Sequence, residues 1–211
     1  KIEFLINYGG EKLDRIAKII GQENINKLNE YVITSILREA GDYLEEKAKI
    51  LGQENINKLS PLNVRKLIIK IENEKIVKIL GQENINKLDA EHISIALKAS
   101  ENIKKMANLL GSKLISKLNP DEMKYILKWR DFEIRNRTPL YGFDRAIQKN
   151  KIIVEVLKVL GSENLAKWDK LDLYNLYKNS DYQFDSTKRV PQLYSTPPDF
   201  IKLRNEIWEI I

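Results

Sequence analysis

Apolar residues recur along most of the chain at intervals of three and four, the spacing that places side chains on one face of an α-helix. Leu13, Ile16 and Ile20 follow this spacing in one segment, and Ile33 and Leu37 follow it in the next. Many of these segments are followed by a glycine, which is favoured where a helix ends by turning through the left-handed region. The glycines of this kind are Gly21, Gly52, Gly81, Gly111 and Gly161.

The sequence after these glycines is repeated. Gly-Gln-Glu-Asn-Ile-Asn-Lys-Leu occurs without change at Gly21–Leu28, Gly52–Leu59 and Gly81–Leu88, and loosely at 111–118 and 161–168. The first four glycines lie about 30 residues apart, a period typical of stacked helical repeats. Each unit reads as a helix, a glycine, a short helical turn, a capping residue and a second helix. Because the apolar face of one unit is too large to hide alone, we expect neighbouring units to stack.

The sequence therefore predicts an all-α fold, an α-solenoid of about five helix-turn-helix repeats of ~30 residues each. We expect tandem repeats over 1–134, an insertion loop over 135–150, a fifth repeat over 151–180, and an extended segment with a C-terminal capping helix over 181–211. The four parts form a single continuous array. Thr138-Pro139 and Tyr141-Gly142 are the turn signals in the insertion. The start on Lys1, inside a helical pattern, indicates a fragment of a larger protein.

The stretch Ile76–Gly81, followed by a short element and Leu88, resembles the repeats of two nucleic-acid-binding families. These are the TAL-effector-like proteins and the mitochondrial transcription termination factors. The resemblance covers residues 11–128 and implies stacked helix pairs, with a base-reading loop between two helices in the TAL-effector-like case. That loop carries a glycine pair in the family. Gln82, Glu83 and Asn84 occupy it here, so no family residue is assigned to this chain.

Composition excludes several kinds of chemistry. The chain has no cysteine and a single histidine, which rules out disulfides and leaves no set of ligands for the usual zinc sites. No nucleophile–base arrangement or phosphate-binding glycine loop is present, and no apolar run approaches the ~18 residues of a membrane span. We therefore expect no catalytic residue, metal or cofactor, no small-molecule substrate, and a protein that is not an enzyme.

Arginine and aromatic residues gather where the period breaks. Four of the nine arginines lie between residues 130 and 145. Such side chains anchor protein interfaces, and they also stack bases and hold phosphates. The alternative is that the aromatic rings pack the insertion onto the repeats while the arginines are solvated. The predicted partner-binding residues are Trp129, Arg130, Phe132, Arg135, Arg137, Tyr141, Phe143 and Arg145.

The favoured function is a protein–protein interaction module, a scaffold or recruitment arm of a larger protein. The alternative is sequence-tolerant nucleic-acid binding along a basic face, because a lysine recurs at one repeat position: Lys27, Lys58, Lys87 and Lys117. The net charge of +6, from 36 basic and 30 acidic residues spread along the chain, is modest support for it. A third hypothesis is a recruiting arm of an enzyme. The repeated Gln-Glu-Asn is either a polar ladder for a periodic partner or the trace of recent duplication.

Overall fold

The chain folds into helices alone wherever its structure is described. The computed structural model describes residues 1–137, 142–179 and 198–211, without the side chains of residues 130–137, 142–143, 145–146 and 179. Within these ranges there are fifteen α-helices, two short 3-10 helices and no strand. The prediction of an all-α fold is confirmed. None of the described helices combines the length and the apolar character that crossing a membrane would require.

Most helices are of three kinds, which we name by their place relative to the repeated glycine. The first helix of a unit precedes the glycine, the short helix follows it directly, and the second helix comes after the short one. The first helices are α2 (Leu13–Ile20), α5 (Leu44–Leu51), the start of α8 (Glu74–Asn86), α10 (Ile103–Leu110) and α13 (Gly142–Leu165). The short helices are α3 (Gln22–Ile25), α6 (Gln53–Ile56), α11 (Ser112–Ile115) and the ends of α8 and α13 beyond their kinks at Gly81 and Gly161. The second helices are α1 (Ile2–Tyr8), α4 (Glu30–Arg38), α7 (Pro61–Ile71), α9 (Ala90–Ala99), α12 (Pro120–Arg137) and α14 (Lys170–Asn179). The 3-10 helices η1 (Gly10–Lys12) and η2 (Gly41–Tyr43) precede α2 and α5, and α15 (Pro198–Ile210) follows α14.

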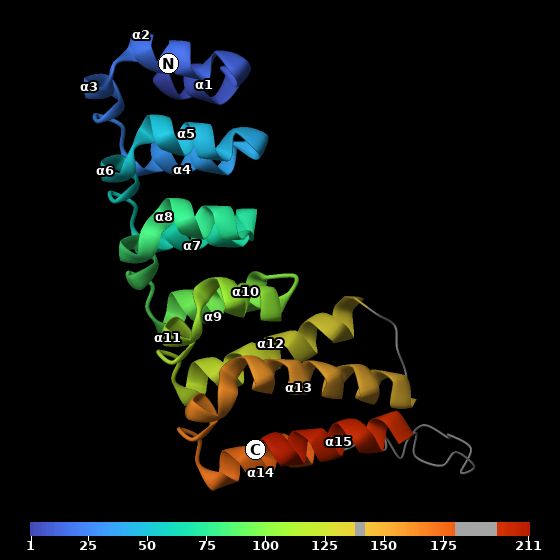
Figure 1. Cartoon of the computed structure of the whole chain (residues 1–211). Coiled ribbons are helices and arrows are strands. Elements are labelled where there is room, and N and C mark those ends of the chain that lie inside the picture. Colours follow the sequence, from blue (N-terminus) through green and yellow to red (C-terminus); the bar gives the residue numbers. More distant parts are fainter. Residues whose placement is uncertain (138–141, 180–197) are drawn as a thin grey trace.

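Each kind of helix forms its own row down the molecule (Figure 1). In the row of first helices, α2 packs on α5, α5 on α8, α8 on α10 and α10 on α13. In the row of second helices, α1 packs on α4, α4 on α7, α7 on α9 and α9 on α12. The short helices lie along one edge (Figure 1). At the C-terminal end α15 packs against α13.

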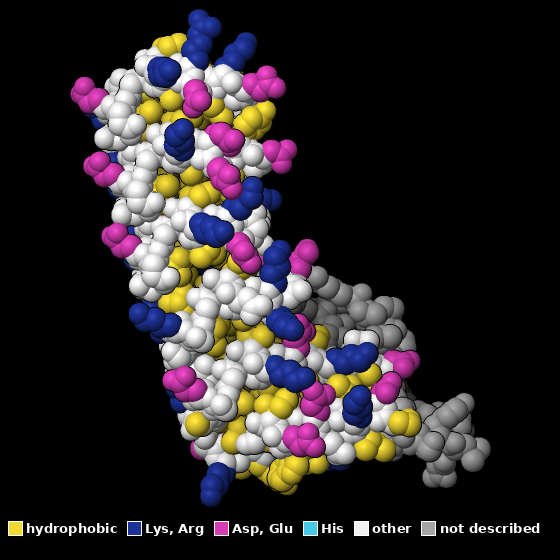
Figure 2. Space-filling view, viewed as in Figure 1, with side chains coloured by type: hydrophobic (Ala, Val, Ile, Leu, Met, Phe, Trp, Pro, Cys, Tyr) yellow, Lys and Arg dark blue, Asp and Glu magenta, His cyan; other side chains and the backbone are white. Residues whose placement is uncertain are grey.

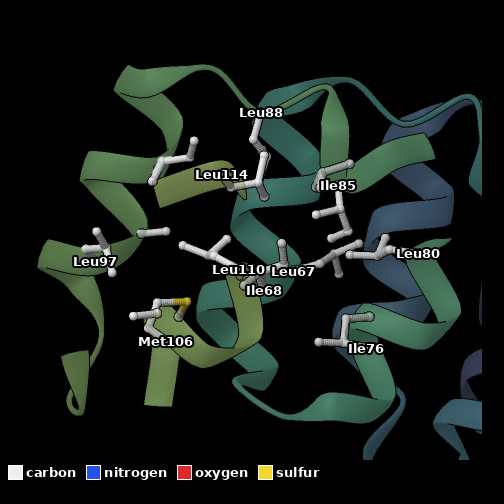
Figure 3. Packing of buried hydrophobic residues seen from close by; sticks show 14 of the residues in the cluster. Leu67, Ile68, Ile76, Leu80, Ile85, Leu88, Leu97, Met106, Leu110 and Leu114 are labelled. Atoms are coloured by element: carbon white, nitrogen blue, oxygen red, sulfur yellow. The ribbon is translucent and has the colours of Figure 1, made fainter. Parts of the chain in front are cut away.

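One apolar core runs between the two long rows. Figure 3 shows Leu67 and Ile68 of α7 pointing toward Leu80 of α8 and Leu110 of α10. These four side chains are between 0 and 5% exposed, and the cluster to which they belong extends from Ile6 to Ile207. Burying one such side chain contributes about 1.5–3 kcal/mol to stability. The core is shared by neighbouring helices at every level, so its burial stabilises the stack as a whole.

The glycine between a first helix and its short helix has a conformation other than the one expected. Gly52 has φ 73° and ψ 154°, and the corresponding glycines 21, 81, 111 and 161 have nearly the same angles. Positive φ with extended ψ lies outside the left-handed helical region and is accessible essentially to glycine alone. A glycine is needed at the end of the first helix, as expected, but for this conformation and not for the left-handed helical one.

The expected insertion loop at 135–150 is helical for most of its length. α12 continues to Arg137 and α13 begins at Gly142. The stretch from Lys128 to Arg137 contains no glycine or proline, so nothing in it stops the helix. As a result α12 and α13 project beyond the helices above them (Figure 1). Of the predicted turn residues, Gly142 begins α13, whereas Thr138, Pro139 and Tyr141 lie outside the described residues. The expected extended segment up to residue 197 also lies outside them.

Replacing Gly52 by alanine should test whether the turn requires this backbone conformation. An added Cβ would approach only Gln22 Nε2, at 3.9 Å, so a steric clash is not expected. The backbone strain alone should lower the free energy of unfolding by about 1–3 kcal/mol in urea denaturation. Lys49→Ala, an exposed change on the same helix α5, is the control and should stay within about 0.5 kcal/mol of the wild type. Equal stability of Gly52→Ala and the wild type would contradict the argument.

Candidate functional site

A ladder of asparagine side chains joins consecutive short helices. The Asn55 side chain is fully buried, and its Nδ2 donates to Asn26 Oδ1 at 2.8 Å and to the Leu51 carbonyl at 2.7 Å. One copy later, Asn84 Nδ2 donates in the same way to Asn57 Oδ1 at 2.8 Å. Each such asparagine therefore holds both the end of its own first helix and the short helix of the preceding copy. The side chains of the repeated motif therefore join each copy to the one before it, and we call this row of contacts the seam.

The recurring lysine of the motif belongs to the same seam. Lys87 Nζ donates to the carbonyls of Asn57 at 2.8 Å and Leu59 at 3.2 Å, and to Asn84 Oδ1 at 2.8 Å. The ammonium is stabilised there because these carbonyls lie at and just beyond the end of the short helix α6, where backbone carbonyls lack partners within the helix. Lys117 and Lys167 bind the two corresponding carbonyls of the preceding copy, and Lys58 binds the first of them, that of Asn26.

Most of the lysines proposed for nucleic-acid binding already have partners within the chain. Lys27, Lys58, Lys87 and Lys117 do occupy one edge, but the ammonium groups of the last three already bind carbonyl oxygens. Lys27 instead pairs with Glu23 at 3.1 Å on the surface. Figure 2 shows basic and acidic side chains interspersed over the face of the first helices. A nucleic-acid site usually has a concentrated basic stripe, which this face lacks.

A buried lysine between the long helices also places its ammonium group against oxygens at helix ends. Lys47 of α5 is 2% exposed, and its Nζ lies 3.2 Å from the Glu39 carbonyl and 3.3 Å from Asn7 Oδ1. Both oxygens belong to the C-terminal ends of second helices, α4 and α1. Burial lowers the pKa of the Lys47 ammonium. Lys47 thus ties one first helix to two second helices.

A carboxylate also bridges two copies. Glu30 of α4 accepts hydrogen bonds at 2.8 Å from the Ser60 backbone N–H and at 2.9 Å from Asn63 Nδ2, at the start of α7. Hydrogen bonds from the Ser60 side chain and backbone, followed by that from Asn63, lower the pKa of the Glu30 carboxyl. The ionised form of Glu30 therefore stabilises the packing of α4 against α7.

Of the side chains predicted to bind a partner, the structure describes that of Trp129. This indole is 37% exposed on α12, and Tyr125, one turn earlier, is 49% exposed. The ammonium of Lys98, from α9, lies 3.6 Å from the centre of the Tyr125 ring and 5.0 Å from that of Trp129. The side chains of the other predicted members lie outside the described residues: Arg130, Phe132, Arg135, Arg137, Tyr141, Phe143 and Arg145.

Sequence reasoning missed Tyr125 and Lys98. Tyr125 could have been found, because it lies four residues before Trp129 and a helix places such residues on one face. Lys98 gave no signal, since it reaches the rings only through the packing of α9 against α12. We call Lys98, Tyr125 and Trp129 the aromatic surface.

Shallow hollows open between successive first helices. One of about 500 Å³ lies between α8 and α10 and is lined in part by Val77, Lys78 and Lys105. Another of about 380 Å³ lies between α5 and α8 and shares Lys78. Bands of apolar side chains are visible between the helix layers on this face (Figure 2). The hollows lie where one layer of helices meets the next.

Neither metal-ligand geometry nor comparison assigns a chemistry to the chain. Within the part of the chain that the structure describes, no three His, Asp or Glu side chains are grouped as a metal site would need. Comparison with protein-family models, curated proteins and solved structures finds no match. The resemblance to the two nucleic-acid-binding repeat families thus gains no support from these comparisons.

Replacing Asn55 by alanine should weaken the seam. The change removes the donor of the buried Leu51 carbonyl and the cross-copy bond to Asn26 Oδ1, which keeps its bond from Gln22 Nε2. It should cost about 1–3 kcal/mol of unfolding free energy. Asn24→Ala is a matched control, because Asn24 holds the same motif position but is exposed and donates only to Ile20. It should cost less than about 0.5 kcal/mol. Equal losses in urea denaturation of the two variants would show that the cross-copy bond adds nothing.

The Glu30 bridge should make stability depend on acid. The pKa of Glu30 is lowered in the folded chain, so its contribution is present above the ordinary value of 4.5 and is lost as the pH falls through the folded pKa. The unfolding free energy of the wild type should exceed that of Glu30→Gln at neutral pH. The difference should shrink as the pH falls below about 4.5, the ordinary pKa of the group. A difference that is the same at every pH would argue against an ionised bridge.

Proposed function

We propose that the chain is an α-solenoid of about five helical repeats of ~30 residues, ended by α15 as a capping helix, and that it acts as a protein–protein interaction module. The three rows of helices and the repeated seam support the solenoid. Such arrays offer an extended surface for partners and rarely carry chemistry of their own. The chain serves as a scaffold or recruitment arm and is not itself an enzyme.

The observation that supports the binding site best is the aromatic surface. Exposed Tyr125 and Trp129 stand side by side on α12, and the ammonium of Lys98 lies over both rings. A cation held against aromatic faces contributes about 0.5–1 kcal/mol at exposed sites and limits the motion of the rings. Aromatic side chains fixed in this way lose little freedom on binding and are typical anchors of interfaces.

The chain next to the aromatic surface suits a partner of mixed character. α12 leads directly from Trp129 into the stretch 130–145 with its four arginines. Arginine pairs with carboxylates through two parallel hydrogen bonds. We therefore expect a protein partner that places apolar groups on the rings and acidic groups beside them. Nucleic-acid binding is the weaker alternative, because the recurring lysines are engaged within the seam.

Trp129→Ala should weaken partner binding without unfolding the chain. Truncating an aromatic anchor costs about 2 kcal/mol or more, a loss of about 30-fold in affinity. A photo-crosslinking amino acid at position 125 captures the partner from lysate, and the captured protein, once purified, is titrated against wild type and variant. Capture should survive nuclease and moderate salt. Both chains should show one cooperative thermal transition.

The matched control is Tyr31→Ala. Tyr31 is a 71% exposed aromatic residue on another second helix, α4, away from the aromatic surface. Its removal should leave the affinity unchanged, and a crosslinker at position 31 should capture nothing. Equal affinity of Trp129→Ala and the wild type would refute the site. Capture of nucleic acid that is lost at moderate salt would favour the alternative.

A further inference from the structure

The N-terminal end of the stack exposes positions that are buried in the next copy. Counting from Gly21 and Gly52, Ile19 of α2 corresponds to Ile50 of α5, and Leu5 of α1 corresponds to Ile36 of α4. Ile50 is 7% exposed and Ile36 is 0% exposed, whereas Ile19 is 75% and Leu5 45% exposed. α2 packs on α5 and α1 packs on α4, so the buried members of each pair have a preceding layer beside them. Ile19 and Leu5 are thus apolar side chains that lie exposed at positions which a preceding layer covers in the next copy.

The polar seam is open at the same end. Asn55, Asn84 and Asn24 all donate to the last carbonyl of their own first helix. Asn55 and Asn84 donate in addition to an amide oxygen of the preceding copy, a bond for which Asn24 has no preceding copy in this chain. Lys27 likewise pairs with Glu23, with its side chain 66% exposed. The corresponding lysines bind main-chain carbonyls of the copy before them: Lys58, Lys87, Lys117 and Lys167.

We propose that this end face, formed by Leu5, Ile19, Asn24 and Lys27, binds a further helical repeat of the same type. The occupant is a first helix with a short helix that ends in Asn-Lys-Leu. Its carbonyls receive Lys27, its asparagine amide receives Asn24, and the apolar face of its first helix covers Ile19. Leu5, on the second helix α1, is covered by a second helix of the same added layer, in the way that α1 packs on α4. The proposal continues an interface that recurs between copies within the chain. It rests on the solenoid part of the proposed function and is independent of the aromatic surface.

The test adds such a repeat to the whole chain. A copy of residues 42–62, which carries the sequence of η2, α5, α6 and the first turn of α7, is placed directly before Lys1. Lys1 then takes the place of Asn63, and the grafted glycine keeps the spacing found between Gly21 and Gly52. The thermal midpoint should rise by at least about 4 °C. The rate at which an amine-reactive reagent labels Lys27 should fall to that of Lys58.

Ile19→Glu is the decisive control. In the grafted chain it should abolish the rise in midpoint, because it buries an unpaired charge in the new contact. In the original chain it should shift the midpoint by less than about 2 °C, since Ile19 is exposed there. A graft that changes neither midpoint nor Lys27 labelling overturns the proposal.

Two further outcomes separate this proposal from its alternatives. If the original chain sediments as a dimer that Ile19→Glu dissociates, the face binds a second copy of the chain instead, and the proposal is wrong. The grafted chain with Trp129→Ala should show the full rise in midpoint. A rise there, together with unchanged partner affinity of Trp129→Ala, would leave the end-face proposal standing while the aromatic surface fails.

Discussion

The structure depends on donors placed at the carbonyl ends of helices. An α-helix leaves its last carbonyls without partners, and a short helix has few residues with which to satisfy them. Here the lysine at the position of Lys87 supplies such donors from the following copy. Lys47 does the same for two long helices. The asparagine at the position of Asn55 instead donates to the end of its own first helix, and it also bonds to an amide oxygen of the preceding copy. Because the lysine bonds and the asparagine–asparagine bonds cross between copies, this part of the pairing forms only when the layers are stacked.

This constraint explains why the motif is conserved between copies at some positions and free at others. In the fourth copy Leu114 stands in the place of Asn55, and the lysine contact to the preceding copy is kept. In the fifth copy Asn164 bonds to the Ile115 carbonyl of the preceding copy, where Ser116 stands in the place of the acceptor amide Asn26. The glycine is kept in all five, since its positive φ with extended ψ has no ready substitute. The lysine and the glycine therefore define the unit better than the full motif does.

The use of the lysines inside the seam also shapes what the surface can do. Side chains that look like a basic stripe in the sequence are bound to carbonyls, so they give little attraction for phosphates. The aromatic surface is the opposite case, because Lys98 lies against rings that remain exposed on α12. Binding is therefore best sought where the copies diverge, at α12 and beyond, and at the open end of the seam.

The sequence by itself determined the helices and their order. Spacing of apolar residues along 11–134, the five glycines and the repeated octapeptide are local signals, and local signals decide which segments are helical and where they turn. Only the tertiary structure decided that Asn55 reaches Asn26 and that Lys98 reaches Trp129. These partners lie about one repeat apart in the chain, and the pairing requires the packing distance between two helices. The role of the asparagine in Gln-Glu-Asn also depends on packing between copies. The sequence alone is equally consistent with an exposed polar ladder and with a buried contact between copies.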